Sequence, residues 1–168
     1  MKLKIDKNTK YTDISHYIPL MKEDDINFLL KKINFDFGTL KISYFCELLE
    51  KQDKMVDAVK LKAFENNNAF DFFTWIYGFP LFIEFFSNEL KKFEAPVTEA
   101  AKIASGTLPK TSITESIMIF LQDFFKTKSF SEVEDLTVND YFLAKKAAGQ
   151  REIFEYNLNQ YHNRKIKK

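Results

Sequence analysis

The sequence predicts an all-α protein, an irregular helical bundle of six or seven helices with a long C-terminal helix. In segment after segment, apolar residues recur at the i, i+3, i+4 spacing of one helix face. Breaks rich in Asn, Gly or Pro separate these segments. A chain of 168 residues buries enough surface for one stable domain without a disulfide or a metal ion.

The N-terminal part of the chain divides into an arm and three helical segments. Residues 1–22 form an irregular N-terminal arm. A helix over 23–33 follows, and its three acidic residues at the start interact favourably with the helix dipole. The same periodicity predicts helices over about 39–51 and 53–65, before a turn of three asparagines. Together with the segment that comes next, these helices form a predicted aromatic-rich core over 23–94.

That next segment carries the densest aromatic block of the chain. We expect one helix over about 69–77 that ends at Gly78, and a second helix that begins at Pro80 and ends before Pro96. The aromatic residues of the block are Phe70, Phe72, Phe73, Trp75, Tyr77, Phe79, Phe82, Phe85, Phe86 and Phe93. Their helical spacing favours a hydrophobic core; a partner interface and a stacking platform for a ligand are the alternatives.

A membrane span is not predicted for this block. The apolar run from Phe72 to Phe86 contains Gly78, Pro80 and Glu84, and it is shorter than the roughly 20 residues that cross a bilayer. We therefore expect a core segment and no membrane partner.

The C-terminal part begins with a change of composition. Residues 95–112 are rich in Ala, Ser and Thr and read as a linker, with a short helix over about 98–105. Residues 113–168 form a helix pair, which consists of a helix over about 113–126 and a long helix from Thr137 to about Tyr161, followed by a basic tail.

The long helix carries the predicted interface. Leu143, Ala147, Phe154 and Leu158 lie on one stripe and are the interface residues that we expect to bury between copies. A small-residue patch lies beside them and contains Gly149, which costs about 1 kcal/mol in a helix relative to Ala. Close packing of another backbone or a kink would explain this glycine, and a helix folded back on its own core is the alternative to an intersubunit helix.

Charge and composition exclude several function classes. The net charge of +1 lacks the basic excess of a nucleic-acid-binding protein, and Arg151 and Arg164 are the only arginines. Cys46 is the single cysteine, which rules out an intrachain disulfide and fits a reducing compartment. We expect no specific recognition of nucleic acid.

No pattern in the sequence predicts catalysis, a metal ion or a cofactor. His16 and His162 have no nucleophile or carboxylate signature beside them, and the acidic clusters at 24–25 and 132–135 fit a helix start and a solvated loop. No metal-binding, phosphate-binding or nucleophile motif is present. The sequence therefore predicts a protein that is not an enzyme; a pocket with convergent ionisable groups would reopen that question.

The stretch from Asp135 to Ala148, within Glu132 to Tyr161, resembles segments of small tailed-bacteriophage structural and assembly proteins. Connector components, tail ring proteins and tail assembly chaperones belong to this group. The resemblance implies a virion protein, present in the host cytoplasm during assembly, that contacts copies of itself and other phage structural proteins. A soluble tail assembly chaperone or helical adaptor that binds a partner protein is the alternative.

Overall fold

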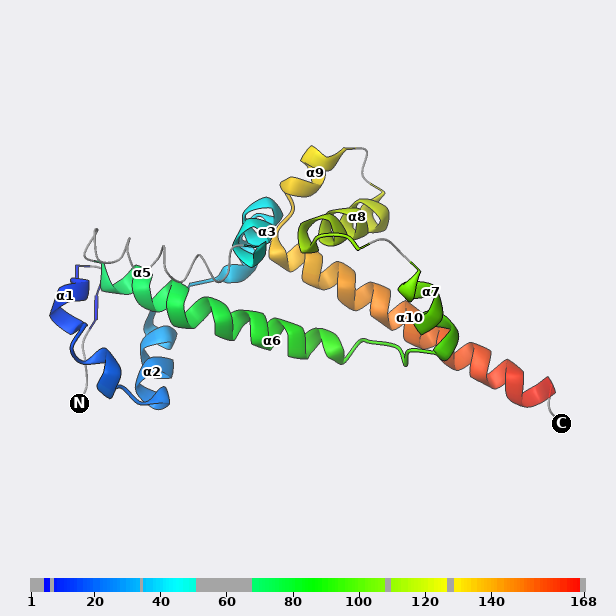
Figure 1. Cartoon of the computed structure of the whole chain (residues 1–168), viewed down its shortest axis with the longest axis horizontal. Coiled ribbons are helices and arrows are strands. Elements are labelled where there is room, and N and C mark those ends of the chain that lie inside the picture. The colour runs from blue at the N-terminus through cyan, green and yellow to red at the C-terminus, as the bar shows by residue number, and fades with distance from the viewer. Residues whose placement is uncertain are drawn as a thin grey trace. The chain divides into compact units, whose positions relative to one another are not determined.

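The computed structural model describes residues 5–6, 8–33, 35–50, 68–107, 110–126 and 129–166. These residues form helices and no strand, and the long C-terminal helix is present, so the predicted all-α class is confirmed (Figure 1). The described residues fall into two compact units: one contains residues up to Phe37 and 68–85, the other 38–50 and the chain from Phe86. The helix predicted over 53–65 lies outside the described residues.

The first unit is built around the N-terminal end of the aromatic block. Its elements are α1 (Tyr11–Ile14), η1 (Ile18–Leu20), α2 (Glu23–Ile33), α5 (Ala69–Phe73), η3 (Thr74–Gly78) and the first turns of α6 (Phe79–Lys91). Ile14, Leu29, Phe72 and Phe73 are buried together in its core. The prediction for α2 is confirmed, and the N-terminal arm contains the short α1 and η1, which are too brief to produce a periodic pattern.

The predicted break at Gly78 is wrong, because α5, η3 and α6 form one continuous helix of 23 residues from Ala69 to Lys91. Its middle, Thr74–Gly78, is a π-helical turn. Such a wider turn precedes Pro80 and accommodates its ring and its missing N–H within the helix. Gly78 has no positive φ; a Cβ there would lie 3.3 Å from the Leu30 side chain and 3.4 Å from that of Phe37. Packing, and not chain reversal, therefore accounts for this glycine.

By length and mean hydropathy alone, the helix Ala69–Lys91 is long and apolar enough to cross a membrane. The core helix of a globular protein can meet the same two criteria. About a third (33%) of its most apolar window is buried in the structure. Most of its exposed positions are polar; they are Asp71, Leu81, Glu84, Phe85, Ser87, Asn88 and Lys91. This distribution is typical of an amphipathic helix that packs on a core, and it favours the predicted core segment.

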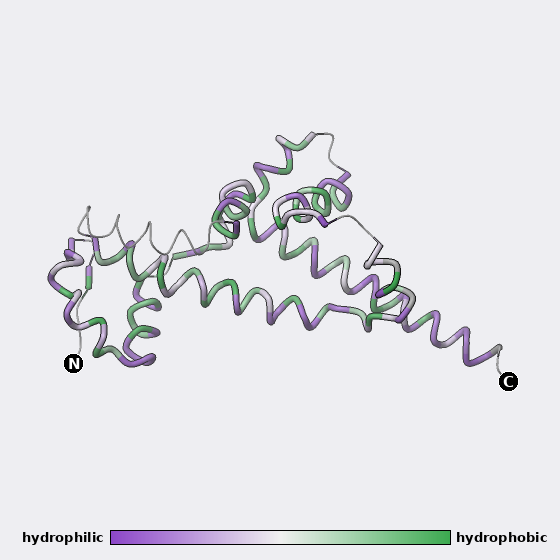
Figure 2. Tube along the Cα trace, in the orientation of Figure 1, coloured by the Kyte–Doolittle hydropathy of each residue, from purple (hydrophilic) through white to green (hydrophobic). Residues whose placement is uncertain are grey.

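The aromatic block is mainly core. Phe72, Phe73, Phe79 and Phe86 are buried, while five other members are half-buried. Figure 2 shows the corresponding apolar colouring along α5 and α6. Phe85, at 63% exposed, is the exception.

The second unit joins α3 to the C-terminal helices. Its helices are α3 (Ile42–Glu50), α7 (Glu99–Gly106), α8 (Ile113–Phe125), α9 (Phe130–Glu134) and α10 (Val138–Ile166), and the short η2 (Phe37–Thr39) precedes α3. Ile42, Phe45, Leu121 and Val138 are almost fully buried in this unit. The starts of α3 and α10 are held together by an isolated antiparallel bridge between Lys41 and Thr137.

Capping residues determine where the two main C-terminal helices begin. Ser112 and Glu115 form a reciprocal capping box at the start of α8. At the start of α10, the Asp140 carboxylate accepts a hydrogen bond of 2.8 Å from the Thr137 backbone N–H, and the Asp140 N–H donates to the Thr137 hydroxyl at 3.3 Å. The predicted starts of both helices are therefore confirmed. The polar segment before Thr137, predicted as a loop, contains the short α9, and α10 continues to Ile166, beyond its predicted end.

Candidate interaction surfaces

The outer face of α10 exposes the four predicted interface residues. Leu143, Phe154 and Leu158 are 60%, 66% and 43% exposed, and Ala147 is also exposed. At 100° per residue, the four side chains fall in a sector of about 60°. Tyr161 continues this stripe, which we call the α10 stripe, to the next turn, and its side chain is exposed as well. The part of the chain that the structure describes therefore leaves the whole α10 stripe uncovered.

The opposite face of α10 packs on its own unit. Ala144 and Gly149 are buried there, and a Cβ on Gly149 would lie 2.0 Å from the backbone oxygen of Phe93. The small-residue patch thus lets the chain just after α6 approach the α10 backbone, with Gly149 Cα close to a carbonyl oxygen. Of the two explanations for Gly149, close packing of a backbone is confirmed, and that backbone belongs to the same chain.

Basic side chains border the α10 stripe. Lys146 and Arg151 flank its first half, and Arg164 and Lys165 lie beside its C-terminal end. Figure 2 shows that the last turns of α10 are mainly hydrophilic. A second α10 stripe, packed face to face against this one, would bring like charges together, whereas an acidic partner surface would complement them.

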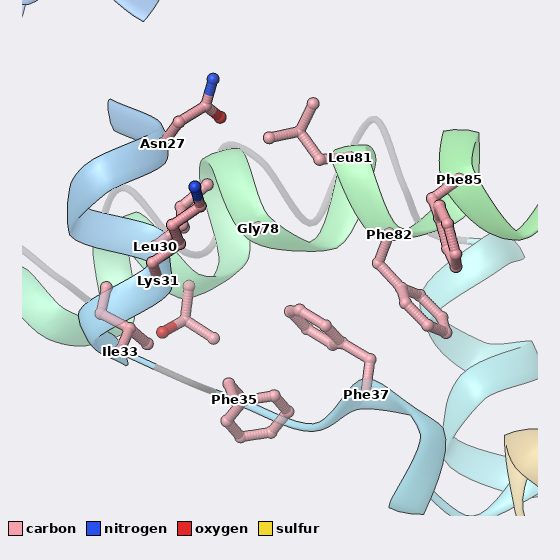
Figure 3. Close-up of a pocket in the computed structure, with 11 residues that line it drawn as sticks. Asn27, Leu30, Lys31, Ile33, Phe35, Phe37, Gly78, Leu81, Phe82 and Phe85 are labelled. Atoms are coloured by element: carbon pink, nitrogen blue, oxygen red, sulfur yellow. The ribbon is translucent and has the colours of Figure 1, made fainter. Parts of the chain in front are cut away.

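An apolar groove lies in the first unit, beside the π-helical turn (Figure 3). Its volume is about 490 Å³. Figure 3 shows Phe35 and Phe37, from the segment after α2, across the groove from Gly78 and Phe82. Leu81 and Phe85 form an exposed edge of the groove.

The groove offers little polar chemistry. Thr74 lies in the wall of the groove, and its hydroxyl donates a hydrogen bond of 2.9 Å to the Phe70 carbonyl. This donor is therefore used within its own helix. Among the described residues that line the groove, Lys31 is the one that carries a charge. The described lining suits an apolar side chain or segment of a partner.

A second pocket, of about 470 Å³, lies in the second unit between the chain after α6, α8 and α10. Lys145 lines this pocket, and its Nζ lies 4.0 Å from the centroid of the Phe120 ring and 5.9 Å from that of Tyr141. Burial lowers the pKa of Lys145, while the carboxylates of Glu152 and Glu94 raise it in part. This pocket places a half-buried lysine beside aromatic rings, and no local pattern in the sequence predicts it beyond helical periodicity.

The remaining candidate reactive groups are structural. Cys46 is 1% exposed, and its burial raises the pKa of the thiol to about 11, so the thiol stays protonated at neutral pH. Burial also raises the pKa of Tyr141 to about 12. His16 and His162 pack on the rings of the adjacent Tyr17 and Tyr161, in different units. Among the described residues, no three His, Cys, Asp or Glu side chains are grouped so as to hold a metal ion.

No protein-family model, curated protein or solved structure matches this chain.

Proposed function

We propose that this protein is a non-enzymatic structural or assembly subunit of a tailed-phage particle, a small helical bundle that acts as a connector or tail ring component. Its copies associate with one another and with other phage structural proteins, in the host cytoplasm during assembly and then in the virion. The observation that carries the proposal is the exposed α10 stripe, formed by Leu143, Ala147, Phe154, Leu158 and Tyr161 on the outer face of a 29-residue helix.

The physical argument rests on exposed apolar area. Full transfer of a Leu or Phe side chain out of water contributes about 1.5–3 kcal/mol. Three such side chains, Leu143, Phe154 and Leu158, are exposed on one face of α10. Leu143 lies about three turns before Phe154, and Leu158 lies about one turn after it. Several exposed apolar side chains on one helix face mark a protein interaction site more often than isolated exposed residues do.

Charged substitutions on the stripe test the proposal. Ala147→Glu and Leu158→Glu place a carboxylate in the contact, and we expect each to dissociate the oligomer, measured as solution mass by light scattering behind a sizing column. Asn159→Glu is the matched control, because Asn159 is exposed on the same helix but lies off the α10 stripe. An oligomer that survives both stripe substitutions would contradict the proposal.

A second candidate function is supported by the groove of the first unit. An exposed, aromatic-lined groove is what a tail assembly chaperone or helical adaptor needs to hold an apolar segment of its partner. In that case the free protein is a monomer whose groove binds the fluorescent probe anilinonaphthalene sulfonate. We expect Phe85→Ser to reduce the fluorescence of the bound probe, and Leu20→Ser, at a position 77% exposed outside the groove, to leave it unchanged.

A further inference from the structure

The pocket around Lys145 is a built cavity within one unit. Its walls come from three parts of the chain: the last turn of α6 with the segment after it, the middle of α8 and the first half of α10. Phe93 and Val97 contribute from the first of these, Phe120 from the second and Tyr141 from the third. Gly149 fixes the spacing, because its Cα lies against the Phe93 carbonyl with no room for a Cβ. The walls are therefore set by backbone packing, and the lining combines three aromatic rings with aliphatic and charged side chains.

Lys145 places one positive charge inside this lining. One side of the ammonium group is covered by the Phe120 ring at 4.0 Å, in a cation–π contact. The structure records no hydrogen bond or ion pair from Lys145 Nζ to any residue in the described ranges. Its N–H donors are thus available to a ligand on the side away from the ring, at a site where water is partly excluded.

Glu94 and Glu152 limit the charge of that ligand. Both carboxylates line the pocket at its exposed edge and act on Lys145 electrostatically without an ion-pair contact. With one lysine and two glutamates, the local formal charge is −1 before a ligand binds. A single carboxylate is attracted at short range by the ammonium group, whereas a dianion such as a phosphate monoester meets two carboxylates as well.

From this geometry we propose that the pocket binds a small monocarboxylic acid with an aromatic or branched aliphatic body. Its carboxylate accepts hydrogen bonds from Lys145 Nζ, and its apolar body packs among Phe93, Val97 and Phe120. A volume of about 470 Å³ is within the usual range for small-molecule sites. The site is separate from the α10 stripe and does not depend on the proposed assembly function.

The test is a titration of the whole isotope-labelled chain with 4-phenylbutyrate, and two-dimensional NMR spectra follow the binding. We expect saturable shifts at residues 93–97, 120 and 141–152. Two ligand controls need no variant: 4-phenylbutanamide, which lacks the charge, and benzyl phosphate, a phosphate monoester that is mainly a dianion at pH 7.5. We expect each to bind at least about tenfold more weakly, since a charge-assisted hydrogen bond is lost or repulsion is added.

Two substitutions locate the site. Lys145→Met retains the bulk of the side chain and should weaken 4-phenylbutyrate binding at least about tenfold. Lys165→Met, at an exposed lysine of the same helix that does not line the pocket, should leave the binding unchanged. Circular dichroism checks that both variants are folded. The proposal is overturned if 4-phenylbutyrate gives no shifts at millimolar concentration, if the amide binds equally well, or if benzyl phosphate binds more tightly.

Discussion

The contact of Gly149 with Phe93 gives a stability prediction in which two effects have opposite signs. Replacing Gly149 by Ala in the middle of a helix gains about 1 kcal/mol of helix propensity. The new Cβ would lie 2.0 Å from the Phe93 oxygen and 2.9 Å from its carbonyl carbon. An ordinary C···O contact is about 3.3–3.6 Å, so the backbone at Phe93 must withdraw by more than about 1 Å. Overpacking of this kind costs about 1–3 kcal/mol, and a backbone atom cannot escape by changing rotamer.

The clash is expected to exceed the propensity gain. We predict that Gly149→Ala lowers the free energy of unfolding by about 2 kcal/mol, the upper end of the overpacking range less the helix-propensity term. With a urea m-value of about 2 kcal/mol/M, the unfolding midpoint falls by about 1 M. The assay is urea unfolding followed by circular dichroism at 222 nm.

Gly106 supplies the matched control. It is also helical, at the end of α7, and a Cβ there would meet nothing within 4 Å. Gly106→Ala should therefore change the free energy of unfolding by between zero and about +1 kcal/mol, the propensity effect alone. If Gly149→Ala proves as stable as the parent chain or more stable, the close approach of Phe93 is refuted.

Two further predictions concern the second unit. The Cys46 thiol is buried and shares a hydrogen bond with the Thr114 side chain. It should react with a disulfide reagent at pH 8 about 100-fold more slowly in the folded chain than in urea. Because the folded pKa of about 11 lies above the ordinary thiol value of 9.0, the folded state keeps a proton that the unfolded chain loses between these pH values. This proton linkage contributes on the order of 2–3 kcal/mol to the free energy of unfolding; the contribution is present at neutral pH and is lost as the pH rises from about 9 towards 11. In Cys46→Ala, the urea midpoint should no longer fall over this pH range because of the thiol. Ser112→Ala removes the capping box with Glu115 and should lower the free energy of unfolding by about 1 kcal/mol, whereas Ser87→Ala, on the exposed face of α6, should be neutral within about 0.5 kcal/mol.

Local signals in the sequence predict most of the helices, because caps and periodicity act over a few residues. The acidic start of α2 and the Thr137–Asp140 pair at the start of α10 are examples, and both helices begin where predicted. Gly78 shows where this fails. Gly78 and Pro80 together predict a helix end. In the structure, Leu30 and Phe37 pack against Gly78, and the helix continues through a π-helical turn.

The candidate surfaces differ in how far the sequence predicts them. Spacing alone places four residues on one face of α10, namely Leu143, Ala147, Phe154 and Leu158. It does not predict which face of the helix is covered by the rest of its own unit. The Gly149 contact illustrates the difference: the glycine signals a close approach, and only the fold identifies Phe93 as the group that approaches. The groove and the Lys145 pocket combine residues distant in sequence, so no local pattern reveals them.

The solution mass of the purified protein, by light scattering behind a sizing column at low and high salt, tests the central claim most directly. We predict one discrete oligomer that persists at high salt, because apolar contacts strengthen with salting-out ions and screening weakens repulsion between the basic borders of the α10 stripe. A monomer at every salt and protein concentration would contradict assembly through the α10 stripe and favour the adaptor function of the groove.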